Sequence, residues 1–176
     1  MGSLDDVFEL NSLVQSYGLQ DKVMINQTFI NEDVKELFDD IEKDCMKPKA
    51  PKVLMIFDDQ ITNNISQKSS LNMIDQIFIR GRHCNISCII STQKYKSLNN
   101  NVRQLNISHL TVFNGTNKTD IEAIAEEHSN SLSKEEMINL MSDQLQNKYS
   151  FMTVSYQNDI NNRFLDNKFN IININK

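Results

Sequence analysis

Spaced apolar residues near the start of the chain predict two helices. One stripe lies within residues 7–14 and the other within residues 34–45, each with the three-to-four-residue spacing of a helical face. The second helix has the clearer start, because Asn31 is a favourable N-cap. We therefore predict a poorly defined N-terminal segment, residues 1–30, followed by a core over residues 31–176.

Continuous apolar runs predict buried strands after these helices. Residues 53–57 read Val-Leu-Met-Ile-Phe, and residues 86–91 read Ile-Ser-Cys-Ile-Ile-Ser. Runs of this length are typical of strands buried on both faces, as in parallel sheets covered by helices. A helix over residues 71–80 should join the two strands, and a third strand is expected at residues 109–113.

Two capping signals predict the helices of the C-terminal half. Thr119 with Glu122, and Ser133 with Glu136, have the spacing of a capping box. Strands are expected again within residues 151–174. This order of elements predicts an α/β domain of layered sheet and helices, whose ligand site should lie at the carboxyl ends of the strands.

Composition narrows the class of protein. The 176 residues suffice for one core, no apolar run approaches the ~20 residues of a membrane span, and the start lacks the pattern of a signal peptide. We therefore expect a protein that has no membrane span and is not secreted. The three cysteines, Cys45, Cys84 and Cys88, are unevenly spaced, which favours a reducing compartment over a disulfide framework.

The glycine content argues against nucleotide binding. The chain has four glycines, and none of them stands in a phosphate-binding pattern such as G-x-x-x-x-G-K-[ST] or G-x-G-x-x-G. Lys118 and Thr119 follow the third strand, but the preceding glycines of a P-loop are absent. His83, Cys84 and Cys88 lack a fourth ligand for a metal site.

The end of the first predicted strand carries candidate chemistry. Asp58 and Asp59 follow the apolar run directly, in the form of a Walker B element. The first carboxylate at such an edge can hold Mg²⁺ through water, and the second can orient or deprotonate an attacking water. An ordinary strand-to-loop cap gives the same pattern, so the motif alone is a weak signal.

Other polar residues near the strand ends extend this candidate site. Gln93 could bond both a water and a γ-phosphate oxygen. Arg80 and Arg82 could stabilise a transferring phosphoryl group, or simply be cations at a helix C-terminus. Three further cations could contact a nucleic-acid backbone, although a solvated loop agrees better with the net charge of −5. They are Lys94, Lys96 and Arg103.

In combination, these motifs resemble the FtsK–HerA superfamily of DNA-pumping ATPases. Residues 80–93, continuing into 102–105 and 110–114, look most like the genome-packaging ATPases of poxviruses and other nucleocytoplasmic large DNA viruses. The resemblance covers about residue 31 to the C-terminus. It implies a P-loop-NTPase-like (RecA/FtsK-type) sheet flanked by helices, here lacking the N-terminal P-loop unit.

The resemblance also implies roles and partners. Asp58 would serve Mg²⁺, Asp59 the attacking water and Gln93 the sensing of γ-phosphate, while Arg80 or Arg82 would act on the site of a neighbouring subunit. The cofactors would be ATP and Mg²⁺, and the partners double-stranded DNA, other ATPase subunits in a ring, and a viral capsid or membrane packaging site. The location would be the viral factory in the host cytoplasm, or the virion.

Two departures from the family pattern leave three hypotheses open. Asp59 stands where the wider superfamily commonly has Glu, and no P-loop occurs among residues 1–30. We expect the C-terminal part of a packaging ATPase, whose ATP turnover in isolation is negligible. The alternatives are a catalytically degenerate ring subunit or regulatory partner of a complete packaging ATPase, and a plain DNA-binding module.

Overall fold

The computed structural model describes residues 4–26, 31–59 and 73–174 and divides the chain into two compact units. The first unit is Met1–Thr92 and the second is Gln93–Lys176. This boundary falls within the predicted core of residues 31–176, whose extent stays a prediction. The architecture is mixed α/β, with one small parallel sheet, one small antiparallel sheet and flanking helices.

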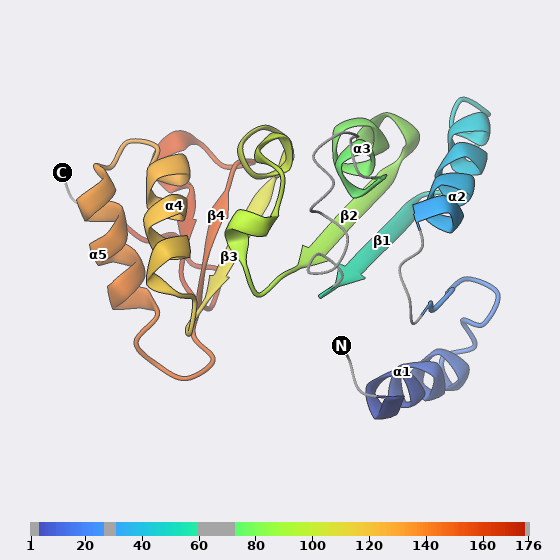
Figure 1. Cartoon of the computed structure of the whole chain (residues 1–176), viewed down its shortest axis with the longest axis horizontal. Coiled ribbons are helices and arrows are strands. Elements are labelled where there is room, and N and C mark those ends of the chain that lie inside the picture. The colour runs from blue at the N-terminus through green and yellow to red at the C-terminus, as the bar shows by residue number, and fades with distance from the viewer. Residues whose placement is uncertain (1–3, 27–30, 60–72, 175–176) are drawn as a thin grey trace. The chain divides into compact units, whose positions relative to one another are not determined.

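The first unit is built on a parallel pair of strands. Pairing runs from Val53 opposite Ile86 to Asp58 opposite Ser91, so the carboxyl ends of both strands meet at one edge (Figure 1). The predicted helices and strands of this half are confirmed within the described residues. Its elements are α1 (Leu4–Ser16), α2 (Asn31–Asp44), β1 (Val53–Asp58), α3 (Met73–Arg80), the 3₁₀ turn η2 (Gly81–Cys84) and β2 (Ile86–Ser91).

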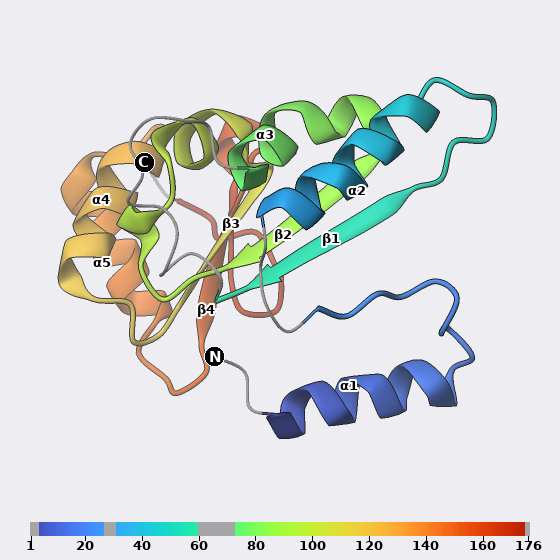
Figure 2. The same cartoon turned by 45° about the vertical axis from the view of Figure 1, so that its right-hand side comes forward.

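Among the described residues of the first unit, helices cover one face of this parallel sheet. Helices α2 and α3 lie over it (Figure 2) and bury Phe38 and Ile77 in a cluster with Met55 and Phe57 of β1. On the other face, three apolar side chains stay exposed: Leu54 (56%), Ile56 (63%) and Ile89 (53%). The prediction that both strands are buried on both faces is therefore wrong, because alternate side chains of a strand point to opposite faces and helices cover one.

The second unit is built on an antiparallel sheet of order β3-β4-β5. The predicted strand at residues 109–113 is confirmed. Its strands are β3 (His109–Phe113), β4 (Phe151–Ser155) and β5 (Phe164–Leu165); its helices and turns are η3 (Tyr95–Ser97), the π-helix η4 (Asn101–Asn106), α4 (Lys118–His128), α5 (Lys134–Gln144) and η5 (Ile160–Asn162).

The last strand is shorter than the sequence predicts. β5 spans two residues, and beyond it only an isolated bridge joins Leu165 to Ile171. The carboxylate of Asp166 accepts hydrogen bonds from the backbone N–H groups of Lys168 and Asn170. An aspartate that bonds its own downstream backbone favours a turn, and here the turn ends the strand.

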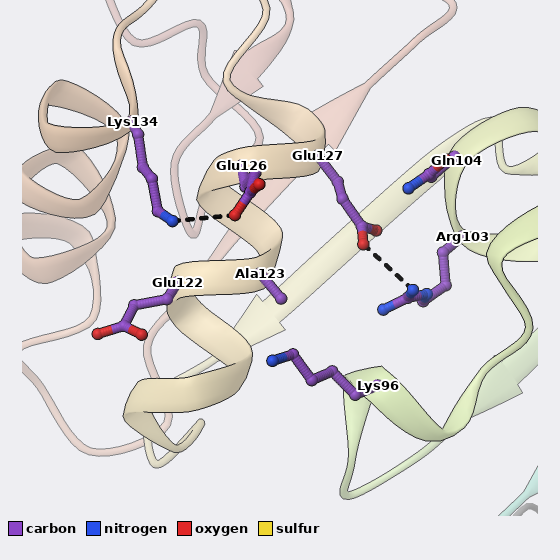
Figure 3. A pocket seen from close by; sticks show the side chains of 8 residues that line it. All are labelled: Lys96, Arg103, Gln104, Glu122, Ala123, Glu126, Glu127 and Lys134. Atoms are coloured by element: carbon purple, nitrogen blue, oxygen red, sulfur yellow. Dashed lines mark hydrogen bonds and ion pairs between the residues drawn. The ribbon is translucent and has the colours of Figure 1, made fainter.

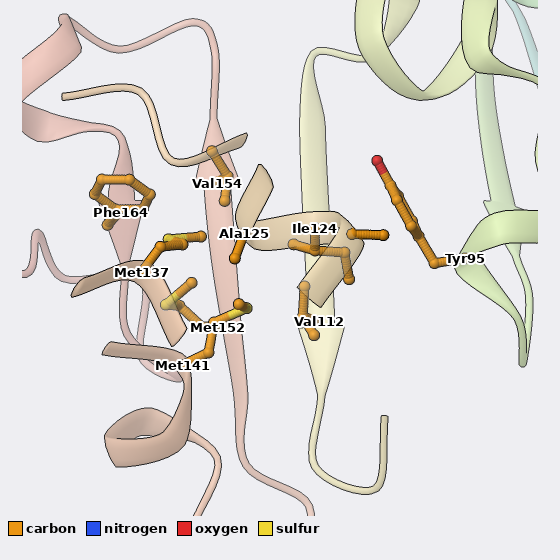
Figure 4. Close-up of a cluster of buried hydrophobic side chains, with 10 residues drawn as sticks. Tyr95, Val112, Ile124, Ala125, Met137, Met141, Met152, Val154 and Phe164 are labelled. Atoms are coloured by element: carbon orange, nitrogen blue, oxygen red, sulfur yellow. The ribbon is translucent and has the colours of Figure 1, made fainter. Parts of the chain in front are cut away.

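Helices α4 and α5 pack on the sheet of the second unit and enclose its core. Fully buried side chains from both helices and the sheet meet there (Figure 4). They include Met137, Met141, Met152, Val154 and Phe164.

One of the two predicted capping boxes is confirmed. Ser133 and Glu136 cap α5 reciprocally, whereas α4 is capped by Asn117, whose side chain accepts a hydrogen bond from the N–H of Asp120. The box at Thr119 is wrong because Asn117 is an equally favourable cap two residues earlier, which starts the helix sooner.

Candidate functional site

Asp58 and Ser91 form the polar end of the parallel sheet. They are opposite each other in the register of β1 and β2, and the Ser91 hydroxyl donates a hydrogen bond to Asp58 Oδ1. Both residues are exposed, so their oxygens are open to solvent. A carboxylate beside a hydroxyl at a strand edge is the kind of oxygen donor pair that Mg²⁺ accepts through its water shell.

Asp59 lies directly after β1 and is hydrogen-bonded to the end of β2. Its N–H donates to the carbonyl oxygen of Ser91 at 3.2 Å, and its φ of 49° lies in the left-handed region. Aspartate and asparagine adopt this region several times more often than other non-glycine residues. The backbone therefore gives a local reason for Asp, rather than the longer Glu, at position 59.

The two candidate arginines differ in their surroundings. The Arg80 guanidinium forms an ion pair with Glu42 of α2 and lies 5.5 Å from the ring centroid of Phe38. Arg82 is exposed and forms no ion pair with any residue in the described ranges. Arg80 thus helps to hold α2 and α3 together, while Arg82 is presented to solvent.

Gln93, Lys94 and Lys96 belong to the second unit. All three are exposed. Gln93 follows Ser91 by two residues, but it lies beyond the boundary between the units, so its expected place beside Asp58 stays a prediction. The backbone N–H groups of Tyr95 and Lys96 both donate to the buried carboxylate of Asp120, which fixes the start of η3 against α4.

Arg103 is buried rather than presented to a phosphate backbone. The residue is 8% exposed, its Nη2 lies 3.2 Å from Glu127 Oε1, and its guanidinium stacks 5.0 Å from the ring centroid of Tyr95. Its Nε is buried and makes no hydrogen bond within the described part of the chain. In this conformation, Arg103 serves the interior of the second unit, and its predicted contact with nucleic acid stays a prediction.

Arg103 and Lys96 line a hollow of about 680 Å³ in the second unit (Figure 3). The lining residues include three cations and three carboxylates, and Lys134 pairs with Glu126 at 3.0 Å beside the pair of Arg103 with Glu127. Because positive and negative charges balance, the hollow has no excess charge to attract a phosphate. The remaining lining residues are Gln104, Glu122 and Ala123.

A buried network around His128 lies next to this hollow. The Tyr95 hydroxyl donates to Glu127 at 2.6 Å and lies 2.5 Å from His128 Nε2, while Tyr156 Oη contacts His128 Nδ1. A carboxylate only accepts hydrogen bonds, so the Tyr95 proton points to Glu127. His128 Nε2–H then donates to Tyr95, and Nδ1 accepts from Tyr156.

Burial keeps this imidazole neutral. It lowers the pKa of His128 from 6.5 to about 4, with the Arg103 charge acting in the same direction and Glu127 opposing it. Burial also raises the pKa of Tyr95 and Tyr156. The network therefore joins η3 to α4 and to Tyr156, just after β4, through a neutral imidazole, and Glu127 is its charged member.

The sequence did not single out Glu127, His128 or Tyr156. Their partners lie 25 or more residues apart along the chain, and a lone histidine in a helix gives no pattern that predicts them. Asp120 carried one available signal, because an acid three residues after Asn117 fits the first turn of a helix. No group of three or more His, Cys, Asp or Glu residues that could hold a metal ion occurs within residues 4–26, 31–59 and 73–174.

Comparison with known proteins decides the family. The model of the poxvirus A32 protein family matches residues 18–165, which include every candidate site residue named above. The chain belongs to the poxvirus A32 family. This is a family of packaging ATPases. No curated protein and no solved structure matches the chain.

The matched region of this poxvirus A32 family member includes α2 and β1 of the first unit and continues to β5 of the second. Within the described residues, no helix is both long and apolar enough to cross a bilayer.

Lowering the pH from 6.5 to 4 is expected to destabilise this A32 family member through His128. Its pKa is about 4 in the folded chain and 6.5 in the unfolded one, so the unfolded chain binds the proton first. The free energy of unfolding is therefore highest above pH 6.5 and falls by about 3 kcal/mol as the pH is lowered to 4. Urea unfolding at pH 7, 5.5 and 4 measures the loss.

Two exposed histidines provide matched controls for His128. His83→Gln and His109→Gln should keep the pH dependence of the wild type, whereas His128→Gln should flatten it, since both control side chains are exposed. The imidazole NMR signal of His128 in the wild type should titrate near pH 4. Titration of that signal near 6.5 would contradict the burial argument.

Proposed function

We propose that this chain is part of a viral genome-packaging ATPase of the FtsK–HerA superfamily, which couples ATP hydrolysis to the translocation of double-stranded DNA into a capsid. The proposal rests on one observation, made in a chain of the poxvirus A32 family. Two parallel strands bring Asp58 and Ser91 together at one sheet edge, and Asp59 directly follows Asp58. In this proposal, β1 with its two acids is a Walker B element.

Each polar residue at the sheet edge has a role in the proposed reaction. Asp58, hydrogen-bonded to Ser91, would hold Mg²⁺ through the water shell of the ion, and Asp59 would orient or deprotonate the attacking water. Gln93 senses the γ-phosphate. Bound Mg²⁺ would supply charge neutralisation at the phosphates of ATP. The described residues offer few ligands of their own, so they would hold the ion together with the nucleotide.

The phosphate-binding loop of an ATPase, the P-loop, is the part of the site that the 176 residues do not supply. The 176 residues contain no G-x-x-x-x-G-K-[ST] motif, so hydrolysis requires backbone N–H groups and a Lys from elsewhere. The open face of the parallel sheet agrees with this requirement. Leu54, Ile56 and Asp58 are two residues apart along β1 and therefore lie on the same face, and Ile89 of β2 lies opposite Ile56. A segment that covered this face would also reach the edge at Asp58.

The proposed partners follow from the surface and the family. Lys94 and Lys96 are exposed cations that can contact the backbone of double-stranded DNA, whereas Arg103 is held in its ion pair with Glu127. The other partners would be ATPase subunits in a ring and a capsid or membrane packaging site. The site of action would be the viral factory or the virion.

A second candidate function is a degenerate ring subunit or regulatory partner of a complete packaging ATPase. The exposed Arg82 favours it, because a guanidinium without an ion pair among the described residues is free to reach the site of a neighbouring subunit. In that role, the chain would contribute an arginine to catalysis without hydrolysing ATP at its own strand edge.

Measurement of ATP turnover tests the proposed function. The purified chain alone is expected to show negligible hydrolysis. Turnover should appear when it is co-expressed with a fragment of another family member that carries a strand, a G-x-x-x-x-G-K-[ST] loop and the following helix, hereafter the P-loop fragment. Robust hydrolysis by the chain alone, abolished by Asp58→Ala, would contradict the need for a P-loop from elsewhere. No turnover with the P-loop fragment, but stimulation of a complete family member, would favour the second function.

A further inference from the structure

Three phenylalanine rings form a row across the sheet of the second unit. Phe113 of β3 stands opposite Phe151 of β4, and their ring centroids lie 5.6 Å apart. The ring centroid of Phe169, in the turn after β5, lies 5.4 Å from that of Phe151. The neighbours Val112 and Met152 are buried in the core with α4 and α5, so this phenylalanine row lies on the opposite face of the sheet.

The outer rings of the phenylalanine row are open to solvent. Phe113 is 56% exposed and Phe169 is 64% exposed, while Phe151 between them is half-buried. The planes of neighbouring rings are tilted by 49° and 53°, so the rings do not stack face to face on one another. Contiguous apolar surface that stays exposed in a folded protein marks an interaction site.

The backbone near this row disfavours the aromatic residues that it carries. Phe169 has a φ of 62°, and Tyr149, two residues before Phe151, has a φ of 66° and is 79% exposed. Glycine, asparagine and aspartate suit this left-handed region, whereas a bulky side chain there costs free energy. Because both side chains are exposed, burial does not offset this cost. Backbone strain of this kind clusters at sites that serve a ligand.

Two lysines give this surface a positive charge. Lys148 Nζ lies 4.8 Å from the ring centroid of Tyr149, and Lys168 lies in the turn after β5; both lysines are exposed. The segments that form the surface contain these lysines and one acid, Asp166, whose carboxylate accepts hydrogen bonds from its own turn. They are residues 109–117, 147–153 and 164–171. A positive surface on a chain of net charge −5 favours an anionic partner.

We propose that the phenylalanine row and the two lysines bind single-stranded DNA. The flat face of any unpaired base stacks on an aromatic ring, and lysines neutralise the phosphates of the backbone. In a duplex the bases stack on one another, so this surface fits a single strand rather than the double-stranded DNA of the proposed function. The choice of DNA over RNA rests on that proposed function, whereas the choice of unpaired bases rests on the rings.

A second copy of this chain fits the surface less well than nucleic acid does. An aromatic side chain buries about 150–250 Å² when it is fully covered, so the partly exposed row offers at most about 400 Å². A stable protein interface buries about 800 Å² on each partner. Lysine is also depleted in the cores of such interfaces. Area and charge therefore both favour nucleic acid.

Fluorescence anisotropy tests the site, with the purified full chain added to a labelled oligo(dT) of about 15 nucleotides at low salt. A blunt duplex should compete only weakly. Phe113→Leu and Phe169→Asn should each weaken binding about 5–100-fold, because each removes one stacking ring. Asparagine suits the φ of 62°, so Phe169→Asn should melt close to the wild type.

Two further variants separate stacking from general apolar contact. Phe113→Tyr keeps an aromatic ring and should bind like the wild type. Ile160→Ala removes an apolar side chain that is 50% exposed on η5, away from the row, and should also leave binding unchanged. Lys148→Gln should lower the slope of log affinity against log salt by about 0.7, the contribution of one phosphate contact on a single strand.

Several results would overturn the proposal. They are no binding of oligo(dT) at low salt, equal affinity for the duplex, and unchanged affinity in both Phe113→Leu and Phe169→Asn. Tighter binding of oligo(U) would contradict the choice of DNA, and a dimer in sedimentation that Phe169→Asn abolishes would assign the row to a second copy. The binding assay contains no ATP, so its failure leaves the proposed ATPase function standing, and absent turnover leaves this site standing.

Discussion

Arg82→Ala is expected to lower the rate of ATP hydrolysis of a mixed ring about 10³-fold or more, if this chain acts on the site of its neighbour. Such a mixed ring contains this chain and a complete family member with a P-loop. An arginine that stabilises a transferring phosphoryl group contributes on that scale. Arg82 is exposed and has no ion pair among the described residues. Steady-state turnover of the purified mixed ring, saturated with ATP, measures the effect.

Arg80→Ala is the matched control, since Arg80 lies two residues away and has the same charge. Its ion pair with Glu42 and its contact with Phe38 give it a structural role. We expect turnover to stay within about twofold and the free energy of unfolding to fall by about 1 kcal/mol. Equal losses of turnover in both variants, or no loss in either, would contradict the assignment of a trans-acting role to Arg82.

Asp59→Asn is expected to reduce turnover by about 10²–10⁴-fold when the chain is combined with the P-loop fragment. General-base assistance contributes on that scale, and the substitution removes the carboxylate while keeping its size. The φ of 49° at this position suits asparagine as well as aspartate. The variant should therefore keep the backbone conformation of the wild type, and urea unfolding of both proteins separates a loss of catalytic rate from a loss of stability.

Asp143→Asn provides a control for the loss of one negative charge, because Asp143 is exposed on α5 in the second unit. It should leave turnover unchanged. A wild-type rate in Asp59→Asn would show that another group activates the water. Two mixtures can be compared: the chain with the P-loop fragment, and the mixed ring of the chain with a complete family member. If Arg82→Ala lowers turnover of the mixed ring while Asp59→Asn changes turnover in neither mixture, the chain is a degenerate partner rather than a hydrolytic subunit.

The sequence predicted the two strands β1 and β2 because their signal is local, and the role of the site residues at their ends stays a prediction. An apolar run ending in Asp58, and a second run ending in Ser91, become neighbours once two parallel strands align. What the sequence could not predict depends on distant partners. The exposure of Ile56 depends on which elements cover the sheet, and the burial of Arg103 depends on Glu127 in another helix.

The limits of prediction at helix ends have a similar cause. Asn117 and Thr119 both satisfy the preferences of an N-cap, and the choice between them depends on where the preceding turn leaves the chain.

Oxidation of the methionines in the core of the second unit should report how often that unit unfolds locally. Met137, Met141 and Met152 are fully shielded, whereas Met24 and Met46 of the first unit are exposed. Peroxide converts a methionine to its sulfoxide only when the sulfur is reached, so the exposed pair should react at once and the shielded three at the rate at which the unit opens. Each sulfoxide adds a polar oxygen to an apolar interior. Oxidative damage in this chain is therefore expected to loosen the second unit at a rate set by the opening of that unit, until the sulfoxides are reduced.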